Sequence, residues 1–388
     1  MNNHVAIIGV GWEGFRPVTP DVSYKELIYQ AARRAYADAG VDPRRDVESF
    51  VKVAEDFHEG TSIFDEYTPD QLGAALKPMH TIPGDGLHGL ATAYMLIRSG
   101  QFEIVAVEGH SKASNILTLP EITGHAQDPL LNRPLRFNTH FVAGLEMQRY
   151  LHDSGTTHEQ CAAVVVKNRR NALRNPSASF GADLTLEEVL SGPPLALPLG
   201  RREAAEHADG AIVIVLASAT KAHALTEQPV WMRGIGWCND SPSLESREWG
   251  SLPYMTKAAH MAYRQAGIAN PGKDIDFAEV DDTYAYKELQ SLEALELFHA
   301  GEAGALTLEG ATSPNGSLPV NVSGGSLGWG NLLDATGLGR ALEVVLQLRG
   351  AAGTRQLKHA QVGLAQSWRG VPTTSGAVVV LSNRISES

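Results

Sequence analysis

Cysteine is nearly absent from this chain of 388 residues, which contains only Cys161 and Cys238. Two widely separated thiols can build neither a disulfide framework nor a zinc site, so we expect no bound metal. Long apolar runs are also missing, because no stretch reaches the roughly 18 uninterrupted apolar residues that a membrane span needs. Residues 1–4 lead straight into a strand-like run rather than a signal peptide, so we expect a cytoplasmic protein that does not enter membranes.

Clusters of basic residues are absent as well. The chain has 32 Lys and Arg against 44 Asp and Glu, which gives a formal net charge of -12 at pH 7. This balance argues against a nucleic-acid-binding surface, although it leaves room for a local basic rim around an anionic ligand. The chain is long enough for two domains, or for one large unit around a sizeable core.

A pattern of strand followed by helix occurs twice in the chain. Residues 5–12 and 230–237 are short apolar runs with glycine near their ends, as expected for strands buried in a covered sheet. Each run is followed by a helical pattern that ends at a glycine, Gly40 in the first copy and Gly267 in the second. The period of about 225 residues is too long for a solenoid, so we predict a duplicated α/β domain.

The predicted halves comprise residues 1–225 and 226–388, and each is a mixed sheet with helices on its faces. The first half carries an insertion at about residues 115–198, which is rich in proline, asparagine and polar side chains. Helical spacing occurs within it at residues 141–152 and 158–173. Because long connections in compact domains are usually lids or binding loops, we predict that this insertion covers a site.

Two short motifs accompany the repeat, Asn321-Val-Ser-Gly-Gly325 and Asp334-Ala-Thr-Gly337. Together with the duplicated halves they resemble the thiolase superfamily, nearest to its sterol-carrier-protein-type members, over nearly the whole chain. The resemblance implies a duplicated thiolase fold in α-β-α-β-α layers. It also implies acyl-CoA and CoA as substrates, with no bound cofactor.

The reactive residues of that superfamily are missing from the matching positions. In the family, a cysteine at a helix N-terminus accepts the acyl group, because the helix dipole lowers the pKa of the thiol there. Counting back from Ser99 and Gly100, which resemble the end of that helix, places this position on Pro83. Asn331 stands where the family has the histidine of a Gly-His-Pro sequence, and Ser323 where many members have a second histidine. We therefore expect no acyl-cysteine of the family type.

The remaining candidates can supply the hydrogen-bond donors and proton carriers that carbon–carbon cleavage beside a thioester requires. Asn331, carried onto the oxyanion-hole histidine of the family, is the predicted donor. The predicted acid–base residues are Asp85, His88, Asp281 and Tyr284. Each also has a structural alternative: a helix cap for Asp85, a packed side chain for His88, a strand end for Asp281 and a core position for Tyr284.

Predicted binding residues belong to the same region. Arg369 suits a carboxylate clamp because guanidinium pairs bidentately with carboxylates, although it could instead pair with an acid of the chain. Such a clamp would point to a dicarboxylic acyl-CoA, and the neighbouring Trp368 is predicted to contact the substrate too. The other predicted substrate contacts are Ser323, Gly324, Gly325 and Gly86. Gly324 and Gly325 could instead be present because they allow two backbone segments to approach closely.

Three functions remain open. The first is an atypical thiolase, in which CoA thiolate attacks a β-oxoacyl-CoA directly or the reverse condensation runs. Similar members act with a small zinc-ribbon/OB-fold protein, as in the thiolase of anaerobic toluene degradation, which handles benzoylsuccinyl-CoA. The second is a retro-aldolase on a β-hydroxyacyl-CoA, similar to the thiolase-fold aldolases that remove steroid side chains. The third is a non-catalytic scaffold, which would tolerate replacement of Asn331 and Asp281.

The resemblance also predicts how the chain assembles. Thiolase-fold halves pair exposed sheet edges across a two-fold axis, and residues 103–107 are predicted to form such an edge. We therefore expect a homodimer, or a heterotetramer with the zinc-ribbon/OB-fold protein.

Overall fold

The computed structural model describes residues 4–55, 58, 63–116, 118–241, 243–370 and 373–385. In this part of the chain, a mixed sheet has nine strands in the order β3-β2-β4-β7-β1-β8-β11-β10-β9, and β5 and β6 form a separate ribbon. The strands are β1 (Val5–Arg16), β2 (Ser49–Val53), β3 (Met79–Ile82), β4 (Ile104–Lys112), β5 (Pro194–Ala196), β6 (Leu199–Gly200), β7 (Asp209–Ser218), β8 (Val230–Asn239), β9 (Phe277–Glu279), β10 (Val362–Trp368) and β11 (Ser375–Ser382).

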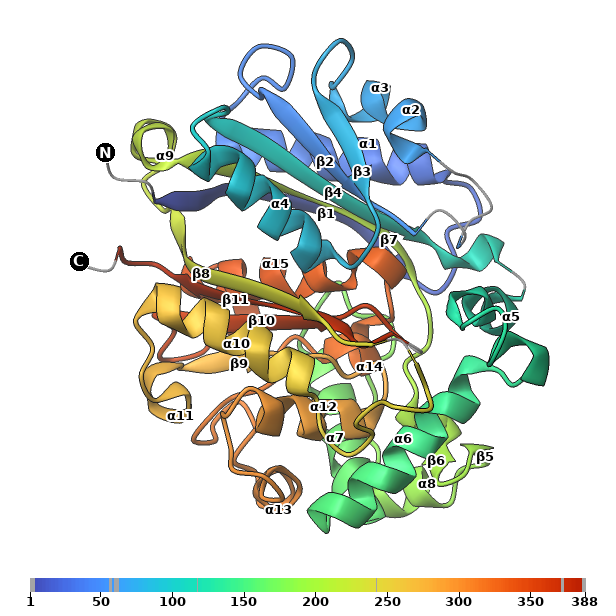
Figure 1. Ribbon diagram of the computed structural model, residues 1–388. Coiled ribbons are helices and arrows are strands. Elements are labelled where there is room, and N and C mark those ends of the chain that lie inside the picture. Colours follow the sequence, from blue (N-terminus) through green and yellow to red (C-terminus); the bar gives the residue numbers. More distant parts are fainter. Residues whose placement is uncertain are drawn as a thin grey trace.

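Helices cover both faces of this sheet (Figure 1). They are α1 (Tyr24–Ala39), α2 (Phe64–Tyr67), α3 (Pro69–Leu72), α4 (Gly86–Arg98), α5 (Leu119–Thr123), α6 (Thr139–Ser154), α7 (His158–Ala172), α8 (Leu186–Leu190), α9 (Ala219–Leu225), α10 (Pro253–Ala266), α11 (Pro271–Asp274), α12 (Ala285–Ala294), α13 (Ala303–Leu308), α14 (Gly325–Trp329) and α15 (Thr336–Leu348). None of the helices in the described part of the chain combines the length and apolarity that crossing a membrane would require.

The strand pairing repeats itself in the two halves. The antiparallel pairs β1–β7 and β7–β4 have counterparts in β8–β11 and β11–β10. The parallel pair β2–β4 corresponds to β9–β10, and the parallel pair β2–β3 corresponds to a bridge between Ala278 and Val320. Pairing of Ala6 with Trp231 and of Ile7 with Val230 joins the halves. The predicted duplicated α/β architecture is therefore confirmed.

Glycine pairs explain why the same strand pattern occurs twice in the sequence. A Cβ on Gly9 or Gly11 of β1 would lie 2.4 Å and 2.2 Å from carbonyl oxygens of α1. A Cβ on Gly234 or Gly236 of β8 would lie 2.0 Å and 2.1 Å from carbonyl oxygens of α10. Each outer helix can approach its strand this closely only because these positions lack a side chain.

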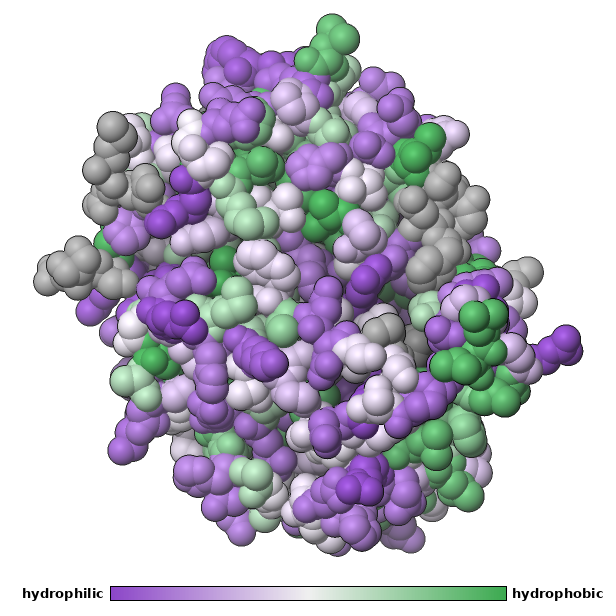
Figure 2. Space-filling model, viewed as in Figure 1, coloured by the Kyte–Doolittle hydropathy of each residue, from purple (hydrophilic) through white to green (hydrophobic). Residues whose placement is uncertain are grey.

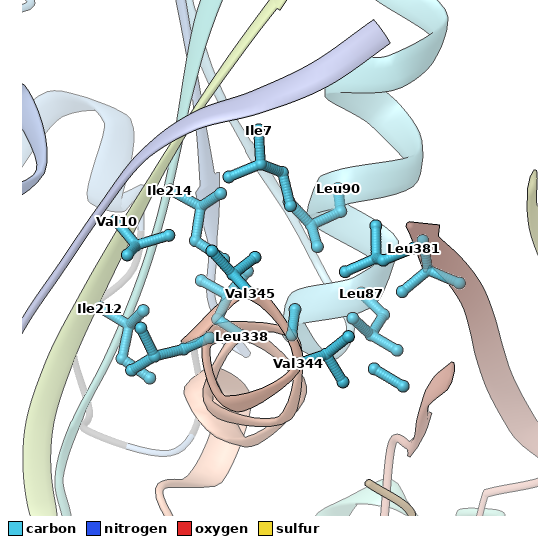
Figure 3. Close-up of a cluster of buried hydrophobic side chains, with 14 of the residues drawn as sticks. Ile7, Val10, Leu87, Leu90, Ile212, Ile214, Leu338, Val344, Val345 and Leu381 are labelled. Atoms are coloured by element: carbon cyan, nitrogen blue, oxygen red, sulfur yellow. The ribbon is translucent and has the colours of Figure 1, made fainter. Parts of the chain in front are cut away.

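Five layers follow from these contacts. Helix α1 packs on β1 and α10 packs on β8, so these two helices form the outer layers. Helices α4 and α15 pack against each other and against strands of both halves (Figure 1). Figure 3 shows the core between the halves, where Leu87 and Leu90 of α4 meet Leu338, Val344 and Val345 of α15. The two halves thus share one central layer.

The expected sheet edge at residues 103–107 is wrong. β4 contains most of this segment and pairs with β2 on one side and with β7 on the other, so it lies inside the sheet. An apolar run of this length suits an interior strand as well as an edge, so the sequence did not separate the two. Among the described strands, β3 ends the sheet order on that side.

The insertion lies between β4 and β7 and contains α5 to α8, with helices near both predicted helical runs. Helix α7 packs on α12, α13 and α14, which belong to the second half. Figure 2 shows apolar side chains gathered over α5 and α6. The exposed apolar side chains in and near these helices include Leu130, Leu131, Leu135, Phe141 and Leu145.

Candidate active site

A cavity of about 360 Å³ opens where both halves and the insertion meet. Its lining includes Glu55 after β2, His140 in α6, His207 before β7, Asp281 after β9 and Asn331 after α14. The segment between β4 and β7 therefore forms part of the wall of this cavity. A concave site built from several segments, with a few converging polar groups, is the usual form of an active site.

Asn331 is held from several sides. Its amide oxygen accepts hydrogen bonds from Leu333 N (2.9 Å) and from the Thr336 hydroxyl (3.1 Å). Its backbone N–H donates to the carbonyl of Glu206 (2.7 Å), and its carbonyl accepts from Ala208 N (3.0 Å). The amide NH2 group has no hydrogen-bond partner among the described residues, so this donor is available to a ligand in the cavity.

Tyr284 and His140 form a hydrogen-bonded pair in the cavity wall. The Tyr284 hydroxyl lies 3.0 Å from His140 Nδ1, and the two rings meet edge to face. Burial raises the pKa of Tyr284, and the negative charge of Glu146 adds to this effect. Burial lowers the pKa of His140, and Arg201 lowers it further. Both side chains are therefore neutral at neutral pH, and a proton can be shared between them.

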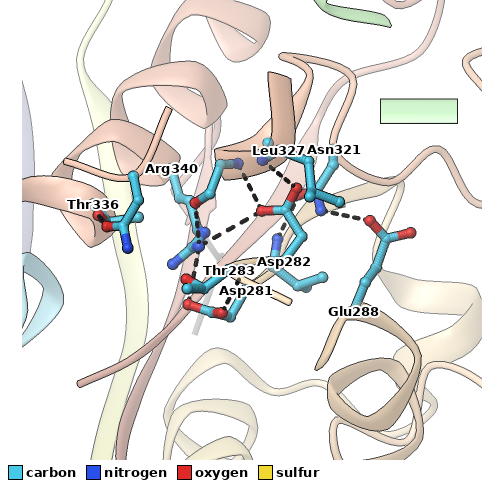
Figure 4. A network of polar contacts seen from close by, with 12 residues as sticks. Asp281, Asp282, Thr283, Glu288, Asn321, Leu327, Thr336 and Arg340 are labelled. Atoms are coloured by element: carbon cyan, nitrogen blue, oxygen red, sulfur yellow. Dashed lines mark hydrogen bonds and ion pairs between the residues drawn. The ribbon is translucent and has the colours of Figure 1, made fainter. Parts of the chain in front are cut away.

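A buried polar network lies behind the wall at Asp281 (Figure 4). The carboxylate of Asp281 pairs with Arg340 (3.0 Å) and accepts a hydrogen bond from Thr283 N (3.0 Å). The adjacent Asp282 accepts from Ser326 N (2.7 Å), and burial raises the pKa of this carboxyl to about 6 despite the charge of Arg340. Asp281 thus lines the cavity as a carboxylate held in place by a buried guanidinium.

Arg369 and Trp368 also line the cavity. The guanidinium Nε of Arg369 contacts the carboxylate of Glu55, so this arginine already has an acid of the chain as its partner. The indole N–H of Trp368 donates to the carbonyl of Thr373 (3.0 Å), and Lys287 Nζ lies 4.2 Å from the centre of a Trp368 ring. The predicted contact of these residues with substrate stays a prediction.

Asp85, Gly86 and His88 lie at the start of α4 and are not part of the cavity lining. The Asp85 carboxylate accepts hydrogen bonds from Leu87 N (3.1 Å) and from Gly337 N of α15 (2.9 Å), so it caps two helices. Burial raises its pKa to about 6. His88 Nε2 lies 3.2 Å from the Ser375 hydroxyl, and burial lowers the pKa of His88 to about 4. The structural alternatives weighed for Asp85 and His88 describe these contacts.

Ser323, Gly324 and Gly325, which were predicted to contact the substrate, pack against neighbouring parts of the chain and are not among the residues that line the cavity. Ser323 donates to a carboxylate oxygen of Glu279 (2.5 Å) and is fully buried. A Cβ on Gly324 would lie 2.6 Å from Ala172 Cβ, and one on Gly325 would lie 2.1 Å from the Asp282 carboxylate. These contacts account for both glycines by close packing, and the predicted contacts with CoA stay predictions.

No cysteine belongs to the described lining of the cavity. Cys161 is fully buried in α7, where burial raises the pKa of its thiol well above the ordinary value. Cys238 is half-buried at the end of β8. Pro83, which was predicted to stand in place of the family's cysteine, is exposed. Within the described ranges, no three His, Cys, Asp or Glu side chains are grouped so that they could hold a metal ion.

Several polar residues of the cavity were not predicted from the sequence, namely Glu55, His58, Asp334, His140 and His207. Burial lowers the pKa of His207 to about 4, and His58 Nδ1 lies 3.2 Å from the Asp334 carboxylate. A weak signal existed for some of them. Glu55 and His58 follow β2, where loop residues often carry function, and Asp334 opens one of the quoted motifs.

Comparison with known proteins identifies the class. Residues 238–383 match the family described as "Thiolase C-terminal domain-like". The acetyl-CoA acetyltransferase of Methanothermobacter thermautotrophicus is 30% identical, with 96% of this chain and 97% of that protein covered. Sterol carrier protein 2 of Oryctolagus cuniculus is 30% identical, with 93% and 69% covered. The chain therefore belongs to the thiolase superfamily, and its relatives include sterol-carrier-protein-type members.

Two further similarities concern a thiolase subunit and a solved aldolase. The benzoylsuccinyl-CoA thiolase subunit BbsB of Thauera aromatica is 29% identical, with 53% of each chain covered. The solved structure named Ltp2-ChsH2(DUF35) aldolase superposes with a TM-score of 0.84 over 98% of this chain and 97% of that chain, at 24% identity. The predicted thiolase fold is thereby confirmed.

Proposed function

We propose that this protein is an atypical thiolase, which cleaves the bond between the α- and β-carbons of a β-oxoacyl-CoA with a second CoA or runs the reverse condensation. The observation that carries the proposal is Asn331. It lines the cavity, and its NH2 group has no partner among the described residues. The resemblance to the superfamily carries Asn331 onto the oxyanion-hole histidine. A fixed N–H donor in a partly enclosed site stabilises the negative charge of a thioester enolate.

The proposed reaction needs no acyl-enzyme. The CoA sulfur forms a bond to the β-carbon, and the bond between the α- and β-carbons breaks. Its electron pair moves to the α-carbon and the thioester oxygen, where Asn331 donates a hydrogen bond. The thiol loses one proton and the α-carbon gains one. The neutral Tyr284–His140 pair can carry that proton, because its two groups share one hydrogen bond of 3.0 Å.

A second candidate is retro-aldol cleavage of a β-hydroxyacyl-CoA. It is supported by the lack of a cysteine in the described cavity lining and by the similarity to the solved aldolase. The β-hydroxyl would lose a proton, the same carbon–carbon bond would break, and the same enolate would form beside Asn331. The products would be one thioester and an aldehyde or ketone, and no second CoA would be consumed.

We also propose a small zinc-ribbon/OB-fold protein as a partner. The name of the solved aldolase couples Ltp2 to ChsH2(DUF35), and the similar BbsB is itself a subunit of a thiolase. The homodimer or heterotetramer, the cytoplasmic location and benzoylsuccinyl-CoA as a possible substrate stay predictions.

Product analysis by mass spectrometry tests the proposal. The protein, with its small partner, is incubated with CoA and a β-oxoacyl-CoA series, and separately with the matching β-hydroxyacyl-CoA series. Two thioesters from the first series support the thiolase. One thioester with an aldehyde or ketone from the second series alone supports the aldolase, and no product from either series contradicts both.

Asn331→Asp is the informative variant. The aspartate keeps an oxygen for Leu333 N and the Thr336 hydroxyl but removes the NH2 donor. Loss of one oxyanion donor should lower kcat by about 10²- to 10³-fold. Asn315→Asp makes the same chemical change at an exposed position and should leave kcat unchanged. Equal kcat in the Asn331→Asp variant and the unmodified protein would remove Asn331 from the mechanism.

A further inference from the structure

Building on the proposed function, we infer that Glu55 makes the site selective for acyl groups that carry no free carboxylate in addition to the thioester. Glu55 holds Arg369, which would otherwise bind such a group, and it thereby acts as a specificity-determining residue. This inference concerns the acyl part of the substrate and not the CoA part, and it argues against benzoylsuccinyl-CoA, whose acyl group carries a free carboxylate.

The argument begins with the cations of the cavity. Within the described lining, Arg369 is the one arginine or lysine side chain. Its Nε contacts a carboxylate oxygen of Glu55, and Glu55 is 7% exposed whereas the Arg369 side chain is 29% exposed. The acid is therefore the more deeply buried partner. A substrate carboxylate that took Arg369 would leave Glu55 buried without its partner, which is strongly unfavourable.

The position of Glu55 is fixed by the backbone. Glu55 follows β2, and its N–H donates to a carboxylate oxygen of Asp334 (2.7 Å). The preceding Ala54 N–H donates to the carbonyl of Ile82 (3.2 Å) at the end of β3. Bonds on two successive residues hold this segment, so the Glu55 carboxylate is positioned before any ligand arrives.

The other charges of the cavity disfavour a free carboxylate on the acyl group. Glu55, Asp281 and Asp334 place three carboxylates in the described lining against the single guanidinium of Arg369. Asp281 is already paired with the buried Arg340. His140 and His207 stay neutral because burial disfavours their charged forms. A carboxylate on the acyl group would enter a site whose balance of charge is negative, and like charges at close range disfavour binding.

A pair of inert ligands tests the inference. CoA thioethers of equal length are prepared, one ending in a carboxamide and one in a carboxylate, and their Kd values for the full-length protein are measured by calorimetry. We expect the carboxamide to bind at least about 10-fold more tightly, because the carboxylate would be repelled by the like charges of a partly buried site. Equal affinity, or tighter binding of the carboxylate, would overturn the inference even if CoA itself binds.

Glu55→Gln supplies the decisive comparison. This change releases the Arg369 guanidinium and should reduce the preference for the carboxamide at least tenfold or reverse it. Glu66→Gln, an equal change of charge at an exposed position of α2, should keep the preference of the unmodified protein. An unchanged preference in Glu55→Gln contradicts the inference. Failure of both thioethers and of CoA to bind would instead contradict the proposed function.

Discussion

Burial sets the protonation of single residues around the candidate site. His207 lines the cavity, and burial together with the nearby histidines His140 and His58 lowers its pKa to about 4. Its unfolded-state value is close to 6.5. Between these two values the unfolded chain binds a proton that the folded protein does not bind. The free energy of unfolding therefore falls as the pH falls through this range.

We predict that His207→Gln removes part of this pH dependence. A pKa difference of this size corresponds to about 3 kcal/mol between pH 7 and pH 4. The variant should lose correspondingly less stability over that range than the unmodified protein, as measured by urea unfolding at a series of pH values. His299→Gln, a change at an exposed histidine, should keep the slope of the unmodified protein. Identical slopes for His207→Gln and the unmodified protein would show that His207 titrates alike in both states.

Some residues of the site could be predicted from the sequence, and others could not. Asn331, Asp281 and Tyr284, which were predicted from the sequence as site residues, all line the cavity. The partner of Arg369 was beyond sequence reasoning, since Glu55 is 314 residues away and only the folded topology brings the two together. His140 and His207 carry no motif, so nothing in their local sequence distinguishes them from surface histidines.

At the scale of elements, the short helix α14 depends on a glycine whose backbone and surroundings both exclude a side chain. Gly325 has φ 59°, and a Cβ there would lie 2.1 Å from the Asp282 carboxylate. Asp282 in turn accepts hydrogen bonds from Ser326 N and Leu327 N. One buried acid thus fixes the start of this helix, which precedes Asn331 by a few residues.

We predict that Gly325→Ala lowers the free energy of unfolding by about 3 kcal/mol or more, because a steric clash adds to the strain of a positive φ. Gly350→Ala measures the strain of a positive φ without a steric clash. Gly350 has φ 68° and no neighbour within 4 Å of its Cβ position, so this variant should lose only about 1 kcal/mol. Urea unfolding of both variants measures the difference, and equal losses would show that the Asp282 contact is easily relaxed.

Long elements with a clear apolar period can be predicted from that period alone, whereas short elements have too few residues to show one. Helices α1, α6, α7 and α10 follow apolar spacing that the sequence displays over several turns. Strand β9 has only three residues, which is too few to show alternation. Strand β3 has the sequence Met79-His-Thr-Ile82, whose polar centre shows no apolar alternation, although a strand at the end of a sheet tolerates polar residues.

At the scale of the whole molecule, the two halves share the layer formed by α4 and α15, so neither half has a complete core of its own. Figure 3 shows residues of both helices in contact with strand residues from each half, including Ile7 and Leu381. Separation of the halves would expose this apolar layer to water, at a cost that grows with the exposed area.

We predict that the two fragments of a chain cut between the predicted halves stay associated with each other. A protease site placed at residues 226–229, in the exposed link between α9 and β8, allows cleavage after folding. The two fragments should co-elute in gel filtration, and their unfolding midpoint should depend on concentration. The uncleaved variant should unfold independently of concentration. Fragments that separate and keep native circular dichroism would show two autonomous domains.

The double cap at Asp85 has a consequence for how the two copies of the repeat can change during evolution. Helices α4 and α15 occupy the equivalent central layer, yet α15 has Ala335 at its N-cap, which offers no capping side chain. Asp85 serves both helices through Leu87 N and Gly337 N. A replacement of Asp85 therefore removes hydrogen bonds from both helices at once, so both copies of the repeat depend on one residue of the first copy.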